Sequence, residues 1–91
     1  MTERWDVGRN ELVSQLLQWI VDEEHLSWPE LGKRTGVEYS VFRYLMTGKR
    51  GIGAYSLRKV ADAFPQYRRG IHTLLTASDC EVQNMTIESL L

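Results

Sequence analysis

The spacing of hydrophobic residues along the chain predicts a set of helices. Between residues 10 and 24 the apolar positions cover a face too broad for a helix that merely rests on a surface, which predicts a central packing helix. This face holds Leu12, Val13, Leu16, Leu17, Trp19, Ile20 and Val21. Two short helices are predicted within residues 28–47, and two more over 57–64 and 66–75, with Ser56 as the N-cap of the former. The sequence therefore predicts an all-α fold of five helices.

The hydrophobic pattern weakens beyond residue 75. Residues 80–82 suit an extended strand, and residues 86–91 suit a helical turn. Five apolar side chains nevertheless make this stretch a candidate dimerisation or partner element, with folding back over the preceding helices as the equal alternative. They are Val82, Met85, Ile87, Leu90 and Leu91. We accordingly divide the chain into a domain over 1–75 and a C-terminal tail over 76–91.

The first of the two short helices has clear signals at both ends. Ser27 and Glu30 match the Ser-x-x-Glu capping box that begins a helix, and Leu26 and Leu31 stand where a hydrophobic staple would close over it. Gly36 supplies the positive φ that ends this helix and turns the chain toward the next. The sequence thus predicts a helix, a tight turn and a second helix.

The second short helix, over residues 39–47, has two contrasting faces. At about 100° per residue, one arc is apolar and belongs to the core; it holds Val41, Phe42, Leu45 and Met46. The opposite arc is rich in hydrogen-bonding and aromatic groups and lacks the Glu–Lys pairs of an ordinary solvated face; it holds Tyr39, Ser40, Arg43, Tyr44 and Thr47. A helix that reads a DNA groove needs side chains that donate and accept against base edges. We predict that these five residues read bases, the alternative being an ordinary solvent face.

A wider spaced pattern surrounds this helix pair and covers residues 10–75. Its members are Leu31, Gly32, Gly36, Val37, Phe42, Leu45, Gly48, Lys49, Arg50, Leu57, Val60, Ala61 and Phe64. The pattern resembles the lambda-repressor-like helix-turn-helix family of Xre/Cro type. The resemblance implies a compact five-helix DNA-binding domain whose second motif helix enters the major groove. It also implies that Lys49 and Arg50, directly after that helix, contact DNA phosphates.

Trp28, which opens the first short helix, has two open interpretations. It either packs on the core of the motif or lies against the DNA backbone beside the helix N-terminus, where free N–H groups favour a phosphate.

Three residues depart from the family pattern. Gly32 stands where the family usually has Ala, Thr35 where it has a small apolar residue, and Glu38 where it has a small hydroxyl or amide cap. An acid at Glu38 would oppose phosphate at the mouth of the helix. Two other roles for this carboxylate stay open: it would accept a hydrogen bond from a cytosine amino group, or it would interact favourably with the dipole at the start of the helix.

Charge is unevenly distributed along a chain whose formal net charge is −1. Residues 26–75 hold nine Lys and Arg against three Asp and Glu, a net charge of +6. Residues 1–25 hold two Arg against six acids, a net charge of −4, and the tail holds three acids and no Lys or Arg. Because phosphate neutralisation is local, the basic centre favours DNA as a partner more than the net charge opposes it.

No pattern for catalysis, a metal site or a cofactor stands out. His25 and His72 are far apart and have no metal-ligand spacing, and Cys80 has no basic neighbour in sequence to activate it. One cysteine fits a reducing compartment, and from the sequence we expect neither a membrane span nor a secretory signal. We expect a cytoplasmic protein that is not an enzyme and holds no metal or cofactor.

These features together predict a sequence-specific transcription regulator. We expect a repressor of phage or prophage type that binds double-stranded DNA at a near-palindromic operator as a homodimer. Two alternatives stay open: an antitoxin whose tail binds a toxin, and an interaction module of antirepressor type that keeps the fold without binding DNA. The acidic ends and Glu38 favour the interaction module, whereas the basic centre opposes it.

Overall fold

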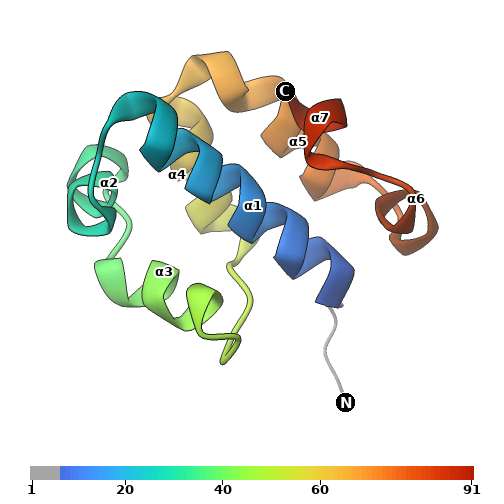
Figure 1. Cartoon of the computed structure of the whole chain (residues 1–91), viewed down its shortest axis with the longest axis horizontal. Coiled ribbons are helices and arrows are strands. Elements are labelled where there is room, and N and C mark those ends of the chain that lie inside the picture. Colours follow the sequence, from blue (N-terminus) through green and yellow to red (C-terminus); the bar gives the residue numbers. More distant parts are fainter. Residues whose placement is uncertain (1–6) are drawn as a thin grey trace.

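A computed structural model describes residues 7–91, and all of their regular structure is helical. The α-helices are α1 (Val7–Glu24), α2 (Trp28–Thr35), α3 (Tyr39–Met46), α4 (Ala54–Ala63), α5 (Arg68–Thr76), α6 (Asp79–Gln83) and α7 (Ile87–Leu90), with one 3-10 turn, η1 (Pro65–Tyr67). In Figure 1, α1 crosses the molecule, with α2 and α3 on one side of it and α5, α6 and α7 on the other. The predicted all-α class is confirmed. Glu3, Arg4 and Asp6 of the acidic N-terminal stretch lie outside the described residues.

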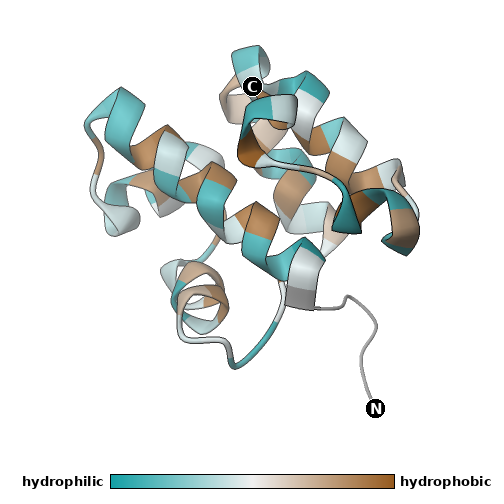
Figure 2. Ribbon diagram, turned by 45° about the vertical axis from the view of Figure 1, so that its right-hand side comes forward, coloured by the Kyte–Doolittle hydropathy of each residue, from teal (hydrophilic) through white to brown (hydrophobic). Residues whose placement is uncertain are grey.

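One hydrophobic core joins all seven α-helices. Besides the buried face of α1, it receives one or more apolar side chains from every other α-helix, among them Leu31, Phe42, Leu57, Ile71, Leu74, Val82 and Leu90. Hydrophobic and hydrophilic stretches alternate along the ribbons (Figure 2), as expected when one side of each helix faces a shared core. The predicted role of α1 as the packing helix is confirmed except at Trp19, which is 41% exposed.

The turn between α2 and α3 forms as the sequence predicts. Ser27 Oγ accepts from the Glu30 N–H at 3.2 Å, and Glu30 Oε1 accepts from the Ser27 N–H at 2.8 Å, which completes the capping box. Gly36 has a φ of 78°, and its N–H donates to the Gly32 carbonyl at 2.8 Å. These bonds fix where α2 begins and ends.

Two of the departures from the family pattern have a local explanation in this turn. A Cβ atom at Gly32 would lie 2.8 Å from the Val37 carbonyl oxygen, closer than real Cβ atoms approach, so alanine does not fit there. The buried Thr35 hydroxyl donates to the Leu31 carbonyl at 2.8 Å and accepts from the Val37 N–H at 3.2 Å. A polar side chain is tolerated at this buried position because its hydrogen bonds are made.

The start of α4 differs from the prediction. This helix begins at Ala54 with Gly53 as its N-cap, so the prediction that Ser56 is the N-cap is wrong. Ile52 is buried in the core, which draws the preceding loop inward and lets the chain enter the helix directly after Gly53. The helix ends at Ala63, one residue before the predicted end at Phe64, and Pro65 begins η1.

The tail is helical throughout its regular part, and the strand predicted over 80–82 is wrong. A second capping box, in which Ser78 and Glu81 exchange side-chain to backbone hydrogen bonds, begins α6 instead. The helical turn predicted over 86–91 is confirmed as α7. Val82 and Leu90 are buried in the core that contains α1 and α5, so the tail folds back over the preceding helices.

Arg9 connects the beginning of α1 to the beginning of the tail. Its guanidinium donates to the carbonyl of Leu74, to the carbonyl of Ala77 at 2.8 Å and to Asp79 Oδ1 at 3.0 Å. The side chain is buried, and such a charge is stabilised only when it is paired and hydrogen-bonded. This contact helps to hold the tail against α1.

Gly70 of α5 gives a test of the folded-back tail. A Cβ atom there would collide with the backbone carbonyl of Leu90 in α7. Gly70→Ala is therefore expected to lower the free energy of unfolding by about 1–3 kcal/mol, the usual cost of overpacking. Without the packed tail, the same change would stabilise the exposed helix by about 1 kcal/mol, because alanine is the better helix former. Denaturant unfolding distinguishes the two outcomes by the sign of the change in the free energy of unfolding.

The two capping boxes that contain a glutamate make the fold sensitive to acid. Hydrogen bonds from the backbone N–H and then the hydroxyl of Ser27 hold the pKa of Glu30 below its ordinary value of 4.5, and Ser78 does the same for Glu81. Because these pKa values are lowered by folding, their contribution to stability is present above about pH 4.5 and is lost as the pH falls through the folded values.

We expect Glu30→Gln/Glu81→Gln to melt at a lower temperature than the wild type at neutral pH. The glutamines keep the hydrogen bonds of the capping box but lose the charge. The difference in Tm should shrink on acidification and vanish once the carboxyls of the wild type are protonated. A difference that stays constant with pH would contradict the assigned role of the charge.

Candidate nucleic-acid interface

The two faces of α3 separate largely as the sequence predicts. Phe42 and Leu45 are buried in the core, and Val41 packs partly against it. The five predicted base-reading residues are all exposed. Together with Lys49, all five line one surface hollow of about 360 Å³, here called the α3 hollow: Tyr39, Ser40, Arg43, Tyr44 and Thr47. The structure thus gathers on one surface residues that were predicted from helical spacing alone.

The dimensions and chemistry of α3 suit a DNA groove. An α-helix with its side chains is about 10–12 Å across, comparable with the width of the major groove of about 12 Å, and α3 has eight residues. The α3 hollow contains no carboxylate, while Arg43 and Lys49 each bring a positive charge to it. A surface of this kind offers hydrogen-bonding groups and cations to an anionic polymer.

The loop after α3 brings the two predicted phosphate contacts back to this helix. Gly48 has a φ of 77°, a conformation that favours glycine, and its N–H donates to the Leu45 carbonyl at 3.1 Å. The chain then reverses, and the Lys49 N–H donates to the Tyr44 carbonyl at 2.9 Å. The Arg50 guanidinium lies 5.5 Å from the centre of the Tyr44 ring, within cation–π range. Lys49 therefore lines the α3 hollow, and Arg50 contacts Tyr44, one of the residues that line it.

Trp28 packs on the core of the motif. Its ring centre lies 5.9 Å from that of Phe42, and the side chain is partly buried. It also lines a smaller hollow of about 200 Å³ that shares Tyr39, Arg43 and Thr47 with the α3 hollow. The packing interpretation of Trp28 is observed, and its predicted contact with phosphate stays a prediction.

Met46 does not belong to the buried arc, contrary to the prediction. It is 44% exposed, accepts a hydrogen bond from Ser14 Oγ to its sulfur at 3.4 Å, and lines the smaller hollow beside Trp28. At about 100° per residue, Met46 lies only about 20° from the exposed Tyr39 and about 40° from Phe42. This border position was available from the sequence, but the hydrophobic character of methionine masked it.

The hydroxyl of Thr47 donates its one hydrogen to backbone carbonyls of α3. It lies 3.0 Å from the Arg43 carbonyl and 3.2 Å from the Tyr44 carbonyl, and it donates to them. Since a hydroxyl has one donor, Thr47 retains acceptor capacity and a methyl group for a ligand.

Lys59 and Tyr55 of α4 lie near the motif and were not singled out from the sequence. Lys59 of α4 donates from Nζ to the Gly36 carbonyl at 3.3 Å and lies 4.7 Å from the ring centre of the exposed Tyr55. A cation at the C-terminal end of α2 is favourable for the helix dipole, so Lys59 supports the turn between α2 and α3.

Glu38 is exposed at the N-cap of α3, and its side chain makes no capping hydrogen bond.

Residues 7–91 offer no cluster of three or more His, Cys, Asp or Glu side chains that would hold a metal ion. Within the same range, no helix is both long enough and apolar enough to cross a membrane. No protein-family model, curated protein or solved structure matches the chain.

Proposed function

We propose that the protein is a sequence-specific DNA-binding transcription regulator of the lambda-repressor-like helix-turn-helix type, with α3 in the major groove. The observation that carries the proposal is the exposed face of α3, whose five polar and aromatic side chains gather with Lys49 around one carboxylate-free hollow. Repression needs only occupancy of a promoter, so the proposed activity requires no catalytic group. The basic segment over 26–75 supplies the attraction to phosphate.

The proposed base contacts differ in chemistry along α3. Arg43 is suited to a bidentate contact with guanine O6 and N7, the commonest specific pairing in the major groove. Thr47, with its hydrogen committed to the backbone, is suited to the methyl group of thymine or to a base amino group. Lys49 and Arg50 contact phosphates, which fixes the orientation of α3 without reading sequence.

The proposed binding unit is a cytoplasmic homodimer on a near-palindromic operator, as in a repressor of phage or prophage type. Two copies of α3 would then occupy successive major grooves about 34 Å apart. As an antitoxin, the chain would have to bind its toxin through the outer side of the tail, because Val82 and Leu90 are buried.

A second candidate function rests on Glu38. This exposed carboxylate stands at the entrance to α3, where it would repel phosphate. An interaction module of antirepressor type would tolerate it and would use the same face of α3 to bind a protein instead of DNA.

The phosphate contacts give a test that distinguishes these two functions. Lys49→Ala/Arg50→Ala is expected to weaken binding to all DNA sequences similarly and to flatten the plot of log K against log salt by about two units, close to one per lost contact. The matched control is Arg68→Ala/Arg69→Ala, which removes the same charge from α5, away from α3 (Figure 1). An unchanged slope in the first variant would show that these residues are not phosphate contacts, and no salt-sensitive binding by the wild type would favour the interaction module.

A further inference from the structure

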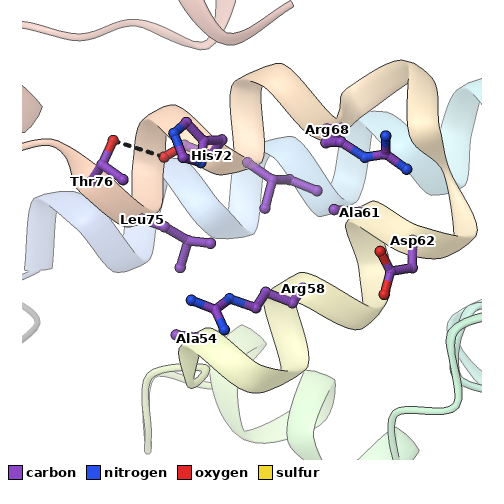
Figure 3. A pocket seen from close by; sticks show the side chains of 9 residues that line it. Ala54, Arg58, Ala61, Asp62, Arg68, His72, Leu75 and Thr76 are labelled. Carbon is purple, nitrogen blue, oxygen red and sulfur yellow. Dashed lines mark hydrogen bonds between the residues drawn. The ribbon is translucent and has the colours of Figure 1, made fainter.

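A second hollow lies between α4 and α5, outside the proposed DNA-reading surface. It has a volume of about 350 Å³, near the lower end of the range for small-molecule sites. Figure 3 shows Arg58 on α4 and Arg68 and His72 on α5 around it. Here it is called the α4–α5 hollow.

Apolar side chains form part of the lining of this hollow. Ala61 and Ile71 are buried, and Leu75 is half-buried at the α5 side. The exposed part of Leu75, with the little that Ala61 and Ile71 leave uncovered, offers a surface for an apolar group about the size of a small ring or a branched alkyl chain. A hydrated inorganic ion has no apolar group, so its binding would leave that surface in contact with water.

The charged groups of the lining are positive in balance. Arg58 and Arg68 stand against one acid, Asp62, which leaves a net charge of +1 with neutral histidine. Within residues 7–91 no ion pair joins either guanidinium to a carboxylate, so both keep their donors for another acceptor. The Thr76 hydroxyl is already committed, since it donates to the His72 carbonyl at 3.0 Å.

From this combination we infer that the α4–α5 hollow binds a small organic monocarboxylate with a compact apolar body. A guanidinium pairs with a carboxylate through two parallel N–H···O bonds, and the arginines on the two helices both border the hollow. The apolar body then packs against Leu75 and the small exposed parts of Ala61 and Ile71. Asp62 disfavours a dianion such as phosphate, which also lacks the apolar body.

Titration of the ¹⁵N-labelled protein with sodium benzoate tests this inference without DNA, so the outcome is independent of the proposed DNA binding. We expect saturable shifts in the amide signals of residues 54–63 and 68–76. Acetate has the carboxylate of benzoate but lacks its ring, and benzamide has the ring but no negative charge. Both are expected to bind at least about tenfold more weakly, because each loses one of the two interactions. Benzoate binding no tighter than either, or phosphate binding as tightly as benzoate, would overturn the inference.

A pair of variants locates the site. Arg58→Gln/Arg68→Gln is expected to weaken benzoate binding at least about tenfold, the loss that follows removal of charge-assisted hydrogen bonds. Arg69→Gln is the matched control, because Arg69 is an exposed arginine of α5 that does not line the hollow. All three replaced side chains are exposed, so retained dispersion of the amide spectrum is expected. Equal affinity of the double variant and the wild type would place the carboxylate elsewhere.

Discussion

Phe42→Ala is expected to lower the free energy of unfolding by about 3–5 kcal/mol, the cost of truncating a fully buried phenylalanine. Phe42 has no solvent exposure and packs against Trp28, so it joins α3 to the core and to α2. Small domains are stable by only about 5–15 kcal/mol, so this one change removes a large part of the total.

Tyr44→Ala is the matched control for this change. It removes a ring of similar size from the exposed face of the same helix, where the loss is a cation–π contact with Arg50. We expect a cost of about 1 kcal/mol or less. Chemical denaturation of both variants measures the difference. Equal losses would show that α3 has a different rotation about its axis from the one described.

Arg43→Ala is expected to remove about 1–3 kcal/mol of discrimination at a single operator position while non-specific affinity changes little. The reason is that Arg43 lines the α3 hollow on the exposed face of α3, where the proposed bidentate contact would reach one base pair. Binding to a set of operators, each with one substituted base pair, measures the change position by position.

Arg43→Lys separates the geometry of this contact from its charge. Lysine keeps the positive charge but lacks the planar fork, so it is expected to lose part of the discrimination while retaining affinity. If Arg43→Ala instead weakens all operators evenly, Arg43 contacts phosphate and sets orientation only.

The sequence predicted best those parts of the fold that depend on neighbouring residues. The beginning of α2 follows from Ser27 and Glu30, and its end follows from Gly36. The same Ser-x-x-Glu signal is present at Ser78 and Glu81, where it begins α6, yet the prediction of a strand over 80–82 did not take it into account. That error was avoidable, because a capping box needs only four residues of sequence.

Contacts between distant segments explain what the sequence did not predict. Arg9 bonds to Leu74, 65 residues away, and Gly70 lies directly beneath Leu90. No local pattern records such pairings, so the packing of the tail stayed open until the structure showed it. The α4–α5 hollow has the same origin, since its lining comes from two helices whose relative placement the sequence does not state.

The candidate DNA-reading face was predictable because it lies on one helix. Helical spacing alone grouped Tyr39, Ser40 and Arg43 on the exposed side, and the structure places them there. The return of Lys49 to the same hollow depends on the positive φ of Gly48, which the sequence suggests only through the family resemblance.

Selection of bound duplexes from a random DNA pool tests most directly the central claim that α3 reads DNA sequence. We expect one enriched site with two-fold symmetry, half-sites whose centres lie about 34 Å apart, and a position that Arg43→Ala relaxes in both halves. An enriched site without symmetry would contradict the dimer. A pool that stays random after repeated rounds would contradict the reading of DNA and leave the interaction module as the function of this face.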